Sequence, residues 1–110
     1  MIKAIVGKNL SGSIRRLSIK GHSGYAEEGQ DIICSAVSAI AYTTAGALGE
    51  LAGIEECYSE ASGYMMISLP ENITAQQEAT AEIILRTAEI GLKQIELSYG
   101  KYVVVVEEEV

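Results

Sequence analysis

The stretch MIKAIVGKNLSGSIRRLSIKGH, residues 1–22, decides the fold that the rest of the chain must join. Its first part places Ile2, Ala4 and Val6 at alternate positions, which is the period of a β-strand. NLSGS is typical of a turn. The second part separates two sides, an apolar one and a polar one made of Arg16, Ser18, Lys20 and His22. We therefore predict an antiparallel hairpin, with the only histidine of the chain, His22, near the end of its second strand.

Two helical segments and two further strands follow this hairpin. Asp31 is a good N-cap for a helix over 32–53, and Thr74 and Gln77 have capping-box spacing at the start of a helix over 74–100. Between them, residues 57–70 favour one strand with Gly63 as a bulge, and 101–110 favour a last strand. The buried stripes are predicted to be Val37, Ile40, Ala41, Thr44, Leu48 and Leu51 in the first helix, and Ala81, Ile84, Leu85, Ala88, Leu92 and Ile95 in the second.

The resulting order, ββαβαβ, predicts an α/β two-layer sandwich with a mainly antiparallel sheet and two helices on one face. A chain of 110 residues is expected to form a single domain, 1–110. Residues 103–106 are all valine, so the last strand is apolar on both faces. A strand of this kind is expected to be covered on both sides, which favours a homodimer.

The charge and the termini restrict the partners. Eight basic and fifteen acidic residues give a net charge of −7, which argues against direct binding to nucleic acid and suits a basic partner. The charge could equally serve solubility alone. The N-terminus lacks the pattern of a signal peptide, and we expect no apolar run long enough to span a bilayer. We therefore expect a cytoplasmic protein without a membrane partner.

The segment GHSGYAEEGQDIICSAVSAIAYTT, residues 21–44, holds the candidate chemistry. With Asp31 as N-cap, Cys34 falls in the first helical turn, where the helix dipole favours a thiolate. A helix terminus supplies about 0.3–1 kcal/mol, and lowering a thiol pKa by two units takes roughly 2.7 kcal/mol. The imidazolium of His22 could supply the remainder. On spacing alone, Cys34 could instead be a small buried hydrophobe and His22 a solvated surface residue.

The same segment resembles the signature of the Prp ribosomal-processing cysteine proteases. The matching positions are Gly21, His22, Ser23, Gly24, Gly29, Asp31, Ile32, Ile33, Cys34, Ser35, Ala36, Val37 and Ser38. The resemblance implies that Cys34 is the nucleophile and His22 the general base and acid, and it points to Gly21, Asp31 and Ser38 as supporting residues. Ser23 departs from the frequent alanine, a change expected to leave the chemistry undisturbed.

The resemblance also implies a reaction and a partner. Members remove a short N-terminal leader, after an aromatic residue, from the large-subunit ribosomal protein numbered twenty-seven, and they work as homodimers without metal or cofactor.

The loop 23–30 is expected to be mobile in the free protein, with Tyr25 as its only large anchor. An aromatic side chain of the leader is expected to dock near Tyr25 or Ile33. Two alternatives remain: a non-catalytic assembly module, and a redox sensor with Cys57 as partner of Cys34.

Overall fold

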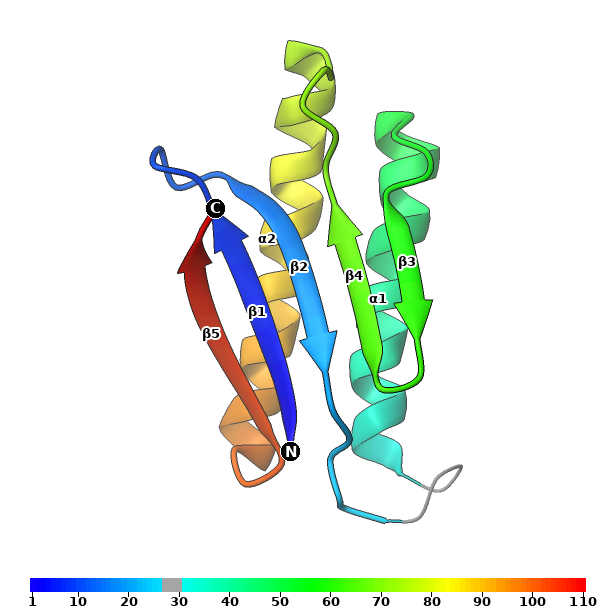
Figure 1. The fold of residues 1–110 in the computed structure, drawn as a ribbon, viewed down its shortest axis with the longest axis vertical. Coiled ribbons are helices and arrows are strands. Elements are labelled where there is room, and N and C mark those ends of the chain that lie inside the picture. The colour runs from blue at the N-terminus through cyan, green and yellow to red at the C-terminus, as the bar shows by residue number, and fades with distance from the viewer. Residues whose placement is uncertain (27–30) are drawn as a thin grey trace.

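Five strands and two helices follow one another in the order ββαββαβ in the computed structural model, which describes residues 1–26 and 31–110 (Figure 1). The strands are β1 Ile2–Lys8, β2 Ile14–Lys20, β3 Tyr58–Ala61, β4 Tyr64–Ser68 and β5 Val103–Glu109, and the helices are α1 Ile32–Ala52 and α2 Ala75–Tyr99.

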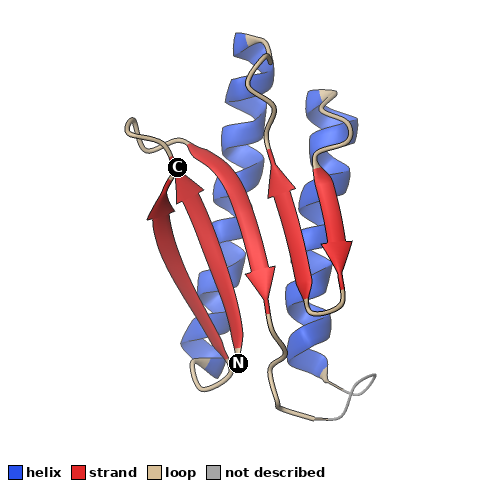
Figure 2. Ribbon diagram, viewed as in Figure 1, coloured by secondary structure: helices blue, strands red, loops and turns tan. Residues whose placement is uncertain are grey.

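The strands form one sheet in the order β3-β4-β2-β1-β5. Three of its pairings are antiparallel, and the β1–β5 pairing is parallel. Figure 2 shows both helices behind the same face of the sheet. The predicted α/β two-layer sandwich with a mainly antiparallel sheet is therefore confirmed, with one strand more than the sequence predicted.

The additional strand comes from residues 57–70, where one bulged strand was expected. The chain instead makes a second hairpin, because Ser62 and Gly63 form a tight turn between β3 and β4. Gly63 has a φ of 69°, a left-handed conformation that only glycine adopts at little cost. The interpretation of Gly63 as a bulge was wrong, and the turn brings this residue beside the candidate site.

Capping fixes both helices as the sequence predicted. Asp31 begins α1, Gly53 ends it with a φ of 68°, and Thr74 and Gln77 form a complete capping box on α2. The buried stripe of α1 differs at its edges from the prediction: Ile33 and Ala52 are buried, whereas Ile40 is half-buried and Leu51 is 70% exposed.

By length and composition alone, α1 could cross a membrane, contrary to the expectation that no such apolar run exists. In this fold its buried side packs against the rest of the core.

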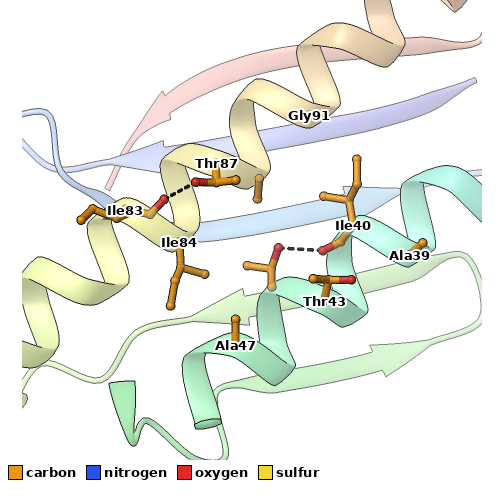
Figure 3. A pocket seen from close by; sticks show the side chains of 10 residues that line it. Ala39, Ile40, Thr43, Ala47, Ile83, Ile84, Thr87 and Gly91 are labelled. Carbon is orange, nitrogen blue, oxygen red and sulfur yellow. Dashed lines mark hydrogen bonds between the residues drawn. The ribbon is translucent and has the colours of Figure 1, made fainter. Parts of the chain in front are cut away.

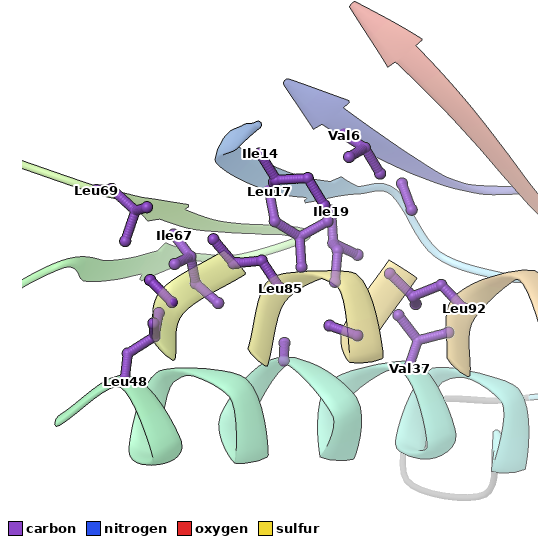
Figure 4. Packing of buried hydrophobic residues seen from close by; sticks show 14 of the residues in the cluster. Val6, Ile14, Leu17, Ile19, Val37, Leu48, Ile67, Leu69, Leu85 and Leu92 are labelled. Carbon is purple, nitrogen blue, oxygen red and sulfur yellow. The ribbon is translucent and has the colours of Figure 1, made fainter. Parts of the chain in front are cut away.

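The core lies between the sheet and the helices. Figure 4 shows Leu17 and Ile19 of β2 meeting Leu85 and Leu92 of α2, with Val37 of α1 beside them. Burial of a side chain of this size stabilises a fold by about 1.5–3 kcal/mol. Because β2 and α1 share this core, the end of β2 and the start of α1 are held close together at one end of the molecule (Figure 1).

Two surfaces remain without a covering element in the described part of the chain. One is a groove between α1 and α2, of about 430 Å³, which is lined mainly by small and apolar side chains, among them Ile40, Ile83 and Ile84 (Figure 3). The other is the face of the sheet opposite the helices, here called the open sheet face. It carries a row of paired positions across four strands, namely Val106, Ile5, Ser18 and Met66.

Candidate active site

His22 is placed by two glycines. Gly21 turns the chain at the end of β2 with a φ of 92°, and a Cβ there would lie 2.5 Å from the carbonyl oxygen of Met1. Its N–H donates to the carbonyl oxygen of Gly63 at 2.9 Å. A Cβ on Gly63 would lie 3.1 Å from Nε2 of His22. The imidazole therefore rests against the β3–β4 turn. A side chain at Gly63 would press on the imidazole, and one at Gly21 would collide with the backbone of Met1.

Cys34 lies in the first turn of α1, as the cap predicted. The carboxylate of Asp31 accepts hydrogen bonds from the N–H groups of Ile33 and Cys34, each at 3.0 Å, while its carbonyl oxygen accepts from the N–H of Ser35 at 3.1 Å. Cys34 is half-buried, so its thiol remains reachable. The start of the helix thus holds the sulfur at a defined place beside its positive end.

Ser23 makes two hydrogen bonds that were not predicted from the sequence. Its side chain is buried, its hydroxyl donates to the carboxylate of Asp31, and its oxygen accepts from the N–H of Tyr25 at 3.0 Å. Alanine could make neither bond, so Ser23 adds to this turn two hydrogen bonds that an alanine would lack. The available signal was the Ser-x-Tyr spacing, because serine readily bonds the amide two residues ahead in a turn.

These contacts keep Asp31 ionised. The hydrogen bond from Ser23 lowers the pKa of Asp31 to about 2, helped by the backbone N–H groups of Cys34 and Ile33 and by the Cys34 side chain, whereas burial acts in the opposite direction. A carboxylate that accepts several hydrogen bonds is stabilised in its charged form. Asp31 therefore serves as a helix cap, and its charge is largely satisfied by donors.

The fold brings the two candidate catalytic residues into one cleft. His22, Cys34 and Ser38 all line two adjoining cavities of about 260 and 430 Å³. Gly21 lines the first of these and Asp31 the second. In the described residues, no hydrogen bond joins the His22 ring to the Cys34 sulfur. Residues twelve positions apart in the sequence thus share one solvent-accessible space.

Tyr25 anchors the first half of the loop to the body of the molecule. Its ring meets the edges of Tyr102 of the α2–β5 turn and Tyr99 at the end of α2, with centroids 5.3 and 6.3 Å apart. Tyr25 therefore acts as the predicted anchor of the loop, the mobility of the loop stays a prediction, and residues 27–30 lie outside the described part of the chain. Ile33 is buried in the core and offers no docking surface for a leader side chain.

One wall of the cleft was not predicted from the sequence. Glu60, Ser62 and Tyr64 of the β3–β4 hairpin line the same cavity as the two candidate catalytic residues, together with Tyr42 of α1. The signal was the Ser62-Gly63 dipeptide, which is typical of a turn, and which splits the predicted strand into two.

Cys57 cannot pair with Cys34 in this fold. Cys57 follows the C-terminal end of α1, whereas Cys34 lies at the other end of the helix. At 1.5 Å per residue, the part of α1 after Cys34 is about 27 Å long, and a disulfide needs Cα atoms within about 7 Å. Burial raises the pKa of the Cys57 thiol. An intramolecular redox pair is therefore excluded.

Comparisons with known proteins agree with this arrangement. The family model described as cysteine protease Prp matches residues 1–104. The ribosomal processing cysteine protease Prp of Bacillus subtilis (strain 168) is 29% identical over 101 residues, which cover 90% of each chain.

Solved structures share the fold. The essential ribosomal processing protease Prp from S. aureus, in complex with a covalently linked product peptide, matches 98% of this chain and 100% of its own, with a TM-score of 0.86 and 23% identity. SMU.848 from Streptococcus mutans matches 100% of this chain and 96% of its own, with a TM-score of 0.80 and 26% identity. Since the family model spans nearly the whole sequence, the chain belongs to the Prp family of cysteine proteases.

Proposed function

We propose that this cysteine protease removes the N-terminal extension of the large-subunit ribosomal protein numbered twenty-seven, with Cys34 as nucleophile and His22 as general base and acid. One observation carries the assignment of these residues: the only histidine and a thiol at a helix N-terminus line the same two cavities. The B. subtilis relative is named for ribosomal processing, which supports the choice of substrate.

The proposed reaction follows the chemistry of a Cys–His pair. His22 takes the thiol proton, and the sulfur of Cys34 attacks the scissile carbonyl carbon. His22 then protonates the leaving amine, and the bond between the carbonyl carbon and nitrogen breaks to give a thioester. Water, deprotonated by His22, hydrolyses the thioester and regenerates the thiol.

The oxyanion that forms in this reaction needs a hydrogen-bond donor, and three amides at the start of α1 are already engaged. The N–H groups of Ile33, Cys34 and Ser35 are already bonded to Asp31. Ser38 lies one turn beyond Cys34 on the same side of α1 and lines both cavities. We assign its hydroxyl to the substrate carbonyl, where a donor stabilises developing negative charge.

The partner and the location follow the same reasoning. A protein of net charge −7 attracts a basic ribosomal precursor before contact, an effect that salt weakens. An enzyme that cleaves such a precursor acts in the cytoplasm. We further propose a homodimer formed through the open sheet face, because Val104 and Val106 of β5 remain half-buried there without a covering element in the described residues.

Two variants test the catalytic residues on the precursor protein. Cys34→Ala abolishes shortening of the precursor, followed by mass spectrometry, but keeps leader binding, because the fold loses only a small group. His22→Ala lowers turnover by about 10²–10⁴-fold and slows alkylation of Cys34 near neutral pH. A Cys57→Ser background removes the second thiol from the alkylation assay.

Turnover by Cys34→Ala above a control without enzyme would refute the nucleophile assignment. An alkylation rate unchanged by His22→Ala would refute the role of the imidazole. Binding of the precursor without shortening by the wild-type chain would instead favour a role in assembly.

A further inference from the structure

The catalytic cleft continues beyond the candidate catalytic pair along α1. Cys34, Ser38 and Tyr42 follow one another at four-residue spacing, so they lie along one side of the helix. All three line the cavity that also contains His22. At 1.5 Å per residue, Tyr42 stands about 12 Å along the helix from Cys34. The β3–β4 hairpin forms the opposite wall and carries Glu60.

Glu60 is a carboxylate held in place at this far end of the cleft. The hydroxyl of Tyr42 donates to its Oε2 at 3.1 Å, and the Tyr42 ring lies 5.9 Å from the ring of Tyr58. Burial, followed by the neighbouring Tyr42 and the charge of Glu60, raises the pKa of the Tyr58 hydroxyl. Among the described residues, no lysine, arginine or histidine forms an ion pair with Glu60. Its carboxylate therefore lines the cleft without an ion-pair partner from the described residues.

The position of His22 indicates which part of the substrate reaches Glu60. The leaving amine belongs to the C-terminal product, and the imidazole that protonates it rests against Gly63 of the hairpin. The part of the substrate that follows the scissile bond thus extends from the His22–Cys34 pair along the side of the cleft formed by the hairpin. An extended peptide rises about 3.3 Å per residue, so the distance of about 12 Å along α1 corresponds to three or four residues.

We propose that Glu60, oriented by Tyr42, forms a subsite for a lysine or arginine at the third or fourth residue after the scissile bond. A carboxylate that already accepts one phenol hydroxyl keeps lone pairs for an ammonium or guanidinium group. The subsite reads the part of the substrate that remains after cleavage, so it would distinguish a basic ribosomal protein from other chains with a similar leader. The proposal rests on the proposed protease function.

The test measures kcat/KM for peptides that span the leader junction of the precursor. A single lysine is placed in turn at the first to sixth residue after the scissile bond, with alanine at the other five. For the wild-type chain we expect a maximum at the third or fourth residue, about fivefold above the all-alanine peptide, as one partly exposed ion pair provides. Glu60→Gln should remove this preference, and Glu60→Lys should reverse it. Glu71→Gln, an exposed acid at the other end of the sheet, is the control and should keep it.

The same peptides are also titrated against Cys34→Ala by fluorescence anisotropy, so that the lysine preference is measured without cleavage. A preference that survives Glu60→Gln, or a maximum on the leader side of the scissile bond, would overturn the subsite. Absence of cleavage by the wild-type chain, with the lysine preference retained in binding, would contradict the proposed function and leave the subsite standing.

Discussion

At the scale of single residues, the hydroxyl of Ser23 helps to hold the Asp31 carboxylate in its ionised form at the start of α1. The hydroxyl of Ser23 donates to one carboxylate oxygen of Asp31, while the N–H groups of Ile33 and Cys34 donate to the other. Asp31 is thus directed to the helix start, where negative charge is favourable. Without Ser23 the carboxylate would lose this buried donor and would keep only the amides of Ile33 and Cys34 and the Cys34 side chain.

We predict that Ser23→Ala makes the protein less resistant to acid. Asp31 has a pKa of about 2 in the folded chain against an ordinary value of 3.8, so its stabilising effect is present above the unfolded pKa and is lost as the pH falls through the folded one. Removal of the Ser23 bond raises the folded pKa and shrinks this effect. The pH midpoint of acid unfolding, followed by circular dichroism, should rise by about half a unit.

Two further variants serve as controls for this measurement. Ser23→Thr keeps a hydroxyl and should restore most of the acid resistance. Ser11→Ala removes a hydroxyl that bonds to Asn9 in the exposed β1–β2 turn, and it should leave the midpoint where it is in the wild type. An unchanged midpoint in Ser23→Ala would show that the Ser23–Asp31 bond does not stabilise the ionised carboxylate.

At the scale of elements, the helices could be predicted from the sequence and the β3–β4 hairpin could not. Asp31, Gly53, Thr74 and Gln77 act on their immediate neighbours, so their capping roles are readable locally. In the hairpin, alternation continues on both sides of Ser62 and Gly63, and a bulge and a turn leave the same local pattern. Only the pairing of Tyr58 with Ile67 across the turn distinguishes them, and that is a tertiary contact.

Part of the candidate site could not be predicted for the same reason, because it depends on tertiary contacts. Cys34 and His22 could be named because their types and their flanking residues are informative. Tyr42 and Glu60 could not, because they meet only when β3 lies beside α1, and neither residue type is unusual on a surface. The contact of Tyr25 with Tyr99 and Tyr102 likewise joins positions more than seventy residues apart, which no local pattern reveals.

We predict that Tyr25→Ala releases the first half of the active-site loop. An edge-to-face aromatic pair contributes about 0.5–1.5 kcal/mol beyond its buried area, and Tyr25 makes two such contacts. Amide hydrogen exchange of residues 23–26 should become roughly tenfold faster. Tyr25→Phe keeps the ring and should exchange at the wild-type rate. Equal exchange in Tyr25→Ala and the wild type would show that the tyrosine cluster does not hold the loop.

At the scale of the whole molecule, the described helices cover only one face of the sheet. The open sheet face carries four half-buried apolar side chains, Ile5, Met66, Val104 and Val106. Charged residues such as Lys3 and Arg16 lie beside them on the same face. Apolar rows on a sheet face are stabilised when a second layer covers them. A second copy of this chain would supply that layer.

We predict a homodimer that the open sheet face mediates. Wild-type protein at micromolar concentration should sediment as a dimer, and Val104→Lys or Val106→Lys should shift it to monomer, because each places a charge in an apolar contact. Ile83→Lys, in the groove between α1 and α2, is the matched control and should stay dimeric. A wild-type chain that sediments only as a monomer would contradict the prediction, and dissociation by Ile83→Lys alone would move the interface to the helices.

The parallel pairing of β1 with β5 has a consequence for biosynthesis. Ile2 pairs with Val103 and Lys8 with Glu109, so β1 is synthesised well before the strand that pairs with it. At about 5–20 residues per second, translation of the intervening chain takes on the order of 5–20 s. During that time β1 has an unpaired edge, which is the kind of surface that recruits other strands. The β1–β5 pairing can therefore form only after the chain up to β5 has been synthesised. Until then, we expect the nascent chain to depend on protection of the free edge of β1 from pairing with other strands.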